Sequence, residues 1–157
     1  MYRMSGQWDD ISQCEAWISQ QINQPESFQF TIEIPNNSTE ECKDKSQKSN
    51  IIGFIGTPAL PESESRQKIL KEIGFMLHPS VWGNGYASEA LQGFVKAIFE
   101  NQNNLTHLIA GVDEGNIASN RVIEKSGFKK VERKIYENKT LGKRVLLKYE
   151  LAKSNLQ

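Results

Sequence analysis

Residues 82–88, WGNGYAS, have types and a spacing that could hold an anion. Gly83 and Gly85 stand one residue apart, directly before an apolar helical pattern. Glycine accepts positive φ and allows close backbone approach, and a helix N-terminus offers unpaired N–H groups and the positive end of its dipole. We therefore predict that the backbone amides of residues 83–87 hold a diphosphate, with the Ser88 hydroxyl in the first helical turn.

Two familiar phosphate motifs do not fit residues 82–88, where a predicted strand gives way to a predicted helix. A P-loop needs G-x-x-x-x-G-K-[ST], and the required lysine is absent. A dinucleotide fingerprint needs Gly or Ala where Ser88 stands, and an acidic residue about 20 positions further on, which is missing. A plain strand-to-helix turn, with the glycines used only for geometry, stays open as an alternative.

The elements that must position this join are strands before it and a helix after it. Apolar runs predict strands at residues 27–34, 51–57 and 69–77. An amphipathic helix is predicted over residues 9–22, and the polar segment 35–50 is predicted to be an exposed loop.

Helices and strands alternate after the join. A wide apolar stripe over residues 87–99 predicts a helix, a strand follows at 106–112, and a short helix at 117–126 ends before Gly127. The remaining residues predict a β-hairpin. This order indicates one α/β domain of mixed α+β type over residues 1–157, with a central twisted mixed sheet of about six strands flanked by helices.

Composition excludes several classes of protein. The chain has 157 residues with 19 basic and 19 acidic side chains, so its zero net charge argues against a general nucleic-acid binder. Cys14 and Cys42 form no CxxC pair and the histidines lack ligand spacing, so we expect no metal and a reducing, cytoplasmic compartment. No signal-peptide pattern or membrane-spanning run is visible, and no membrane partner is expected.

Two blocks of the sequence resemble a known family. Residues 72–91, EIGFMLHPSVWGNGYASEAL, and residues 116–131, NIASNRVIEKSGFKKV, resemble the GNAT superfamily of acyl-CoA N-acyltransferases. They look most like the branch of ribosomal-protein N-terminal acetyltransferases. The resemblance covers residues 50–150 well, but the opening strand of the family is not recognisable here.

The resemblance implies acetyl-CoA as the cofactor. Its pyrophosphate would sit on residues 82–87, and its pantetheine arm would enter a gap where strand 73–77 splays from strand 106–112. Trp82 stands where many family members have Gln or Arg, although it agrees with the branch. The residues assigned to the cofactor are Met76, Leu77, His78, Trp82, Gly83, Asn84, Gly85, Tyr86, Ala87, Ser88, Asn116, Ser119 and Asn120.

Acetyl transfer requires a neutral amine, a polarised carbonyl and a stabilised leaving thiolate. Glu72 is the first candidate base, because it stands beside the expected gap on the face that strand alternation shares with Met76. A solvated or lysine-paired carboxylate is the alternative. Asp113 is the second candidate base, with an Asx-type turn as its alternative, and Asp113 and Glu114 could also attract a cationic amine.

The short helix carries the remaining candidates. Asn116 is predicted to be its N-cap, and the resemblance adds a contact with the CoA arm. Ser119 matches the serine that the branch places near the sulfur, so Asn116 and Ser119 join Glu72 as candidate catalytic residues. Many family members have a tyrosine acid where this chain has Ile123, so water held by these residues could replace it.

These residues predict an N-acetyltransferase that passes an acetyl group from acetyl-CoA to a primary amine by direct attack in a ternary complex. The acceptor is expected to be a small-molecule amine or a protein N-terminus, and the protein a monomer or homodimer. A non-catalytic CoA-binding or protein-interaction module on the same fold is the alternative.

Overall fold

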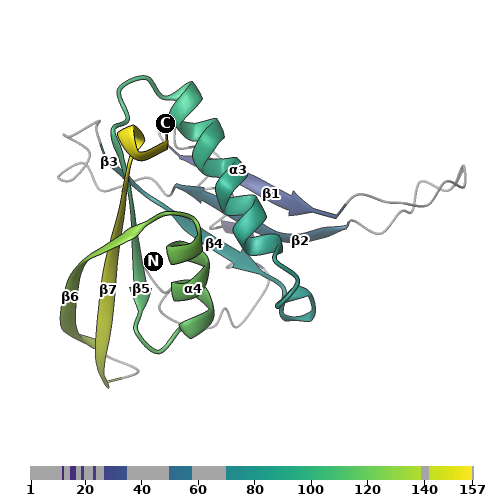
Figure 1. The fold of residues 1–157 in the computed structure, drawn as a ribbon. Coiled ribbons are helices and arrows are strands. Elements are labelled where there is room, and N and C mark those ends of the chain that lie inside the picture. The colour runs from purple at the N-terminus through teal and green to yellow at the C-terminus, as the bar shows by residue number, and fades with distance from the viewer. Residues whose placement is uncertain are drawn as a thin grey trace, which may run out of the picture.

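The computed structural model describes residues 27–34, 50–57, 70–138 and 142–156, together with residues 12, 15, 16, 19 and 23 (Figure 1). The helix predicted over residues 9–22, most of the loop 35–50, and both cysteines therefore lie outside the described residues. The elements in chain order are β1 (Phe28–Glu33), β2 (Ile51–Thr57), β3 (Leu70–Glu72), β4 (Gly74–Leu77), the 3-10 turn η1 (Pro79–Val81), α3 (Tyr86–Asn101), β5 (His107–Asp113), α4 (Ile117–Lys125), β6 (Lys129–Asn138), β7 (Gly142–Ala152) and η2 (Lys153–Leu156).

The strands form two sheets that separate at Ile73. One sheet has the order β1-β2-β4 and the other β3-β5-β7-β6. β3 runs parallel to β5, whereas β4 is antiparallel to β2. The single strand predicted over residues 69–77 is thus broken in two, and the described residues form seven strands where about six were expected. The predicted splaying of the central strands is confirmed.

Ile73 holds the two sheets together at the point of separation. Its side chain is only 2% exposed, and its backbone N–H donates to the Ile109 carbonyl at 2.8 Å. β5 therefore remains bonded to the chain up to Ile73, and the next residues leave it for β2.

The core lies between α3 and the sheets. α3 runs across the sheet of β1, β2 and β4, and α4 lies against β5 (Figure 1). The apolar stripe predicted over residues 87–99 lies on α3 and is buried from Leu91 onward, because its members repeat at helical spacing. Its buried residues are Leu91, Phe94, Val95, Ile98 and Phe99.

Local signals fix both ends of α4 as predicted. The Asn116 side chain accepts from the Ser119 N–H at 3.1 Å, as an N-cap does. At the other end Gly127 has φ +88°, its N–H donates to the Glu124 carbonyl, and the Phe128 N–H donates to the Ile123 carbonyl. This is a Schellman motif, which needs a residue that accepts the left-handed conformation.

Within the part of the chain that the structure describes, we find no helix long and apolar enough to cross a bilayer.

Candidate active site

The two sheets diverge between β4 and β5. The His78 N–H donates to the Ile52 carbonyl at 2.7 Å, so the backbone groups of even-numbered residues in β4 face β2. Alternation then directs the backbone groups of Phe75 and Leu77 toward β5. Among the described residues, β4 pairs only with β2. The side of β4 that faces β5 is therefore a strand edge inside the molecule.

The backbone directions in β4 narrow the set of residues predicted to pair with the pantetheine arm. Of Met76, Leu77 and His78, only Leu77 directs its backbone groups toward the gap. Phe75 was missed, although strand alternation could have identified it. The predicted division of faces is confirmed, because the Met76 side chain is 47% exposed whereas Leu77 is 8% exposed.

The loop that follows β4 is fixed by its own side chains. The Trp82 indole N–H donates to the Leu77 carbonyl at 2.9 Å, which ties the loop back to the strand. The Asn84 amide donates to the carbonyls of Val81 and Trp82 at 3.1 and 3.3 Å. His78 Nδ1 lies 2.7 Å from Ser80 Oγ and also accepts from the Ser80 N–H. His78 therefore shapes this turn.

The start of α3 carries the predicted anion-binding backbone. Gly83 and Gly85 have φ of +83° and +87°, which explains why glycine is needed at both positions. The N–H groups of Ser88 and Glu89 donate to the Gly85 carbonyl at 2.9 and 3.1 Å. By contrast, the N–H groups of Gly83, Gly85, Tyr86 and Ala87 make no backbone hydrogen bond among the described residues, while Asn84 closes the turn over Trp82 and Gly83. They are donors at the positive end of a 16-residue helix, which is a favourable arrangement for a diphosphate.

Glu72 is the last residue of β3, at the point where the sheets separate. It lies opposite Ile109 in the parallel pairing with β5 and is half-buried. The next side chain, Ile73, is buried in the core, so the Glu72 carboxylate belongs to the opposite face, as predicted.

Asn120 holds the turn between β5 and α4. Its side chain is 8% exposed, and Nδ2 donates to the carbonyls of Asp113, Glu114 and Asn116 at 3.0, 3.3 and 2.9 Å. Its Oδ1 accepts from the Tyr149 hydroxyl at 3.0 Å. The Asn120 amide is thus committed to the protein's own backbone, and its effect on the predicted CoA arm would be indirect.

Tyr149 is fully buried beneath this turn. Its single hydroxyl hydrogen is shared between Asn120 Oδ1 and Glu124 Oε1, which lies 3.1 Å away. Burial, together with the hydrogen bond to Glu124 and its negative charge, raises the pKa of Tyr149 to about 12. The phenol therefore keeps its proton and serves as a fixed donor.

The acidic residues at the end of β5 are paired with arginines. Asp113 accepts two hydrogen bonds from Arg144 at 2.8 and 2.9 Å, and Glu114 accepts two from Arg133 at 2.9 Å each. The hydrogen bond from Arg133 holds the pKa of Glu114 below its usual value. Asp113 Oδ1 also accepts from the Gly115 N–H at 2.8 Å. Asp113 is therefore an Asx-type turn residue, and its proposed roles as a base or as an amine attractor are not supported.

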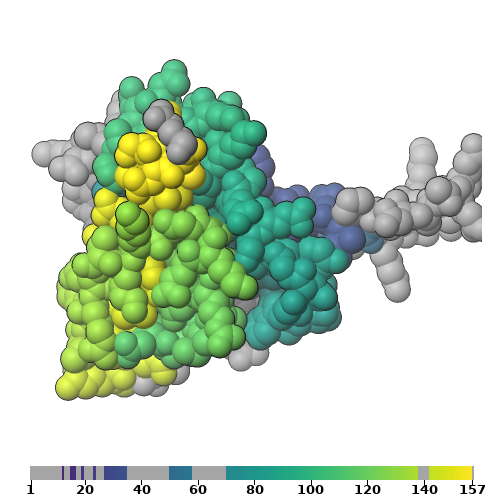
Figure 2. All heavy atoms as spheres, viewed as in Figure 1, coloured from purple at the N-terminus to yellow at the C-terminus, as the bar shows by residue number. Residues whose placement is uncertain are grey.

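The sequence candidates come from three elements of the fold. Glu72 ends β3, the donor-rich backbone begins α3, and Asn116 and half-buried Ser119 begin α4. α3 and α4 are in contact and occupy neighbouring parts of the surface in Figure 2. Such an arrangement can bind an anionic tail at one end of the gap and present a carboxylate at the other.

Comparisons with known proteins place this geometry in context. The family model described as an acetyltransferase (GNAT) domain matches residues 1–129. The chain is 35% identical over 95 residues to the uncharacterized protein YkkB of Bacillus subtilis (strain 168), which covers 55% of either chain. It is 37% identical over 93 residues to the uncharacterized N-acetyltransferase YoaA of the same organism, covering 57% of this chain and 50% of YoaA. The chain thus spans about half the length of the curated relatives it matches.

A solved structure agrees with the fold over a longer range. The spermidine N-acetyltransferase from Vibrio cholerae in complex with CoA and spermine superposes with a TM-score of 0.72, covering 94% of this chain and 78% of that one. At 16% identity, this similarity establishes the shared fold alone.

Proposed function

Because the chain belongs to the acetyltransferase (GNAT) family, we propose that it transfers an acetyl group from acetyl-CoA to a primary amine. One observation supports this reading most strongly. The strand that leaves β5 runs through a short loop directly into the donor-rich start of α3. An edge able to pair with an amide-bearing arm and a backbone able to hold its diphosphate are therefore consecutive in the chain.

The residues present fit such a cofactor. The N–H groups of residues 83–87 would hold the diphosphate, and the backbone groups of Phe75 and the N–H of Leu77, whose carbonyl already accepts from Trp82, would pair with the amides of the arm as an added strand does. When bound, acetyl-CoA supplies the thioester that donates the acetyl group. Asn116 and Ser119 lie at the start of α4, where they would border the arm.

Glu72 is the proposed general base. An ammonium group cannot attack a carbonyl carbon, so the acceptor must first lose a proton. The Glu72 carboxylate stands where the sheets separate and would receive that proton, directly or through water. Of the two carboxylates considered, Glu72 lies where the sheets separate, whereas Asp113 shapes the turn at the end of β5, so we place the base at Glu72.

The nature of the acceptor is a finer proposal. The sequence blocks look most like the branch that acetylates ribosomal-protein N-termini, so we propose an N-terminal amine of a protein as the preferred acceptor. A small polyamine is the competing acceptor, because the fold is shared with a spermidine N-acetyltransferase. Peptides with a free N-terminus and polyamines of similar charge distinguish the two.

Release of CoA thiol from acetyl-CoA across such an amine panel tests the proposal. The wild-type protein should turn over at least one amine. Glu72→Gln should lower kcat by about 10²- to 10⁴-fold with little change in KM for acetyl-CoA. The matched control is Glu100→Gln, which changes an exposed carboxylate near the far end of α3 and should leave turnover unaltered.

Three outcomes would contradict parts of the proposal. Equal turnover by wild type and Glu72→Gln removes Glu72 from its role as base. Thermal stabilisation by acetyl-CoA without turnover of any amine favours the non-catalytic CoA-binding module. No stabilisation by acetyl-CoA or CoA rejects the cofactor site itself.

A further inference from the structure

The turn between β5 and α4, residues 113–116, is held by two arginines of the β6–β7 hairpin. Arg144 of β7 donates to both oxygens of the Asp113 carboxylate, from Nε at 2.8 Å and from Nη2 at 2.9 Å. Arg133 of β6 donates to both oxygens of Glu114 in the same way, at 2.9 Å each. A planar pair with two parallel hydrogen bonds fixes direction as well as distance. The turn is therefore oriented relative to the hairpin.

The two arginines reach the turn from opposite faces of the sheet. Asp113 lies opposite Leu146 in the pairing of β5 with β7, and Arg144 is two residues from Leu146 and so lies on the same face. Arg133 lies opposite Leu147, whose side chain is on the other face, in the core. A tilt of the turn toward either face would therefore stretch one of the two pairs.

The pair between Arg144 and Asp113 is the more protected of the two. The Asp113 side chain is 15% exposed and that of Arg144 is 33% exposed, whereas Glu114 and Arg133 are 45% and 54% exposed. Water and salt weaken exposed ion pairs, so we expect the Arg144 pair to dominate. Asp113 Oδ1 also accepts from the Gly115 N–H at 2.8 Å, which connects the arginine to the backbone of the turn.

The turn leads directly into the first residues of α4. The Asn116 N–H donates to the Asp113 carbonyl at 2.9 Å, and the Asn116 side chain accepts from the Ser119 N–H at 3.1 Å. Asn116 and Ser119 are the residues proposed to border the cofactor arm. Any change in the direction of the turn would move both of them.

We propose that Arg144 is a positioning residue, which acts through Asp113 to aim Asn116 and Ser119 at the cofactor arm. This role rests on the proposed acetyltransferase function and requires no contact between Arg144 and the cofactor. Lysine cannot replace the arginine, because an ammonium group lacks the planar pair of donors that holds both carboxylate oxygens.

Three variants separate positioning from the effect of charge alone. Arg144→Lys keeps the positive charge but loses the planar geometry, and Arg144→Gln loses both. Lys143→Gln removes a positive charge from the exposed neighbouring residue and is the matched control. If only positive charge near an anionic cofactor mattered, Arg144→Lys would behave like the wild type and Lys143→Gln like Arg144→Gln.

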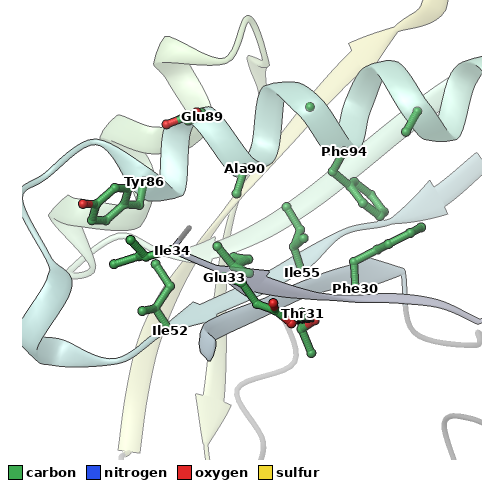
Figure 3. A pocket seen from close by; sticks show the side chains of 13 residues that line it. Phe30, Thr31, Glu33, Ile34, Ile52, Ile55, Tyr86, Glu89, Ala90 and Phe94 are labelled. Atoms are coloured by element: carbon green, nitrogen blue, oxygen red, sulfur yellow. Dashed lines mark hydrogen bonds between the residues drawn. The ribbon is translucent and has the colours of Figure 1, made fainter. Parts of the chain in front are cut away.

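A fourth variant controls for a general loss of stability. Phe94 of α3 is buried, and its ring meets the Phe30 ring edge to face with centroids 5.8 Å apart (Figure 3). Phe94→Leu removes this ring contact and lowers stability without touching the turn before α4. It should leave the affinity for the cofactor unchanged.

Calorimetric titrations with CoA and with ADP test the proposal. CoA carries the diphosphate and the pantetheine arm, whereas ADP carries the diphosphate without the arm. We expect Arg144→Lys and Arg144→Gln to raise the Kd for CoA roughly 3- to 10-fold. Their Kd for ADP should stay at the wild-type value, because the start of α3 is unaltered. In the ligand-free variants, the NMR amide signals of Gly115, Asn116 and Ser119 should shift.

Four outcomes would overturn the proposal. An unchanged Kd for CoA in both Arg144 variants rejects the role of Arg144 but leaves the cofactor site standing. Wild-type affinity in Arg144→Lys alone shows that charge, not geometry, is what matters. Equal weakening of CoA and ADP shows a distortion of the whole fold. A wild-type protein that binds no CoA rejects the proposed function itself, and this role with it.

Discussion

At the residue scale, the buried hydroxyl of Tyr149 connects the core to the candidate site. It donates to Asn120, which in turn holds three carbonyls of the turn from which α4 begins. Asn116 and Ser119 start that helix, so their positions depend on a phenol that no ligand would touch. Tyr149 is therefore a positioning residue, and its protonation state matters to the turn.

Tyr149→Phe should lower the free energy of unfolding by about 1–2 kcal/mol near neutral pH, because Asn120 Oδ1 loses its buried donor. The pKa of Tyr149 is raised from 10.0 to about 12, so the folded state holds this proton more tightly than the unfolded state. The contribution is complete below pH 10.0 and is lost as pH rises toward about 12. Urea melts of both proteins should therefore show a difference that narrows above pH 10.0; a constant difference would contradict the assignment.

At the element scale, the junction between η1 and α3 depends on backbone conformations that only glycine adopts readily. Gly85 is the N-cap of α3 at φ +87° and offers no side chain to cap the helix. The N–H groups at this end are left for another acceptor, which is unusual for a stable helix start. Because no side chain caps α3, the backbone N–H groups at its start remain available to a ligand.

Gly85→Ala should destabilise the protein by roughly 1–2 kcal/mol, because alanine resists the left-handed conformation. The thermal stabilisation by acetyl-CoA should also shrink, since the donors would turn away from their present directions. Gly93→Ala in the same helix is the control, because a Cβ there meets nothing within 4 Å. We expect that control to gain about 0.5–1 kcal/mol in urea melts. A Gly85→Ala protein that responds to acetyl-CoA like the wild type would argue against this cradle.

At the scale of the whole molecule, the fold is two sheets that share one continuous segment of chain. β5 is bonded to β7 along its length but to β3 only from His107 to Ile109, and β4 turns to β2 immediately after Ile73. Among the described residues the sheets therefore end in four edge strands, β1 and β4 in one sheet and β3 and β6 in the other, and the edge of β4 faces the gap. We propose that the edge of β4 inside the gap receives the cofactor.

Amide exchange measured by NMR should distinguish the two sides of β4. The N–H groups of Phe75 and Leu77 face the gap and should exchange faster than the N–H of His78, which is bonded to Ile52. Acetyl-CoA at about ten times its Kd should slow Phe75 and Leu77 by on the order of tenfold. Unchanged exchange at these two residues, in a protein that acetyl-CoA stabilises, would show that the arm binds elsewhere.

Much of this organisation follows from the sequence because the relevant signals are local. The positive φ at Gly83 and Gly85, the cap at Asn116 and the Schellman end at Gly127 each depend on residues within one turn. The break at Ile73 is different, because the apolar run over residues 69–77 has no local interruption and the break is imposed by pairing with two other strands.

The partners of the polar residues also lie far away in the chain. Arg144 is 31 residues from Asp113, and Tyr149 is 29 residues from Asn120. No pattern in a single sequence indicates hydrogen-bonded pairs this far apart. The sequence alone therefore leaves Asp113 as a candidate base and Asn120 as a candidate cofactor contact.

The hydrogen bond from the Trp82 indole to the Leu77 carbonyl gives the loop before α3 its shape without any outside help. This segment therefore loses its conformational entropy when the chain folds, so that ligand binding costs little further conformational entropy. A preorganised receptor of this kind gains affinity through rigidity rather than through additional contacts. Removing the hydrogen bond from Trp82 to Leu77 would therefore lower the affinity of the loop for its ligand through a loss of rigidity.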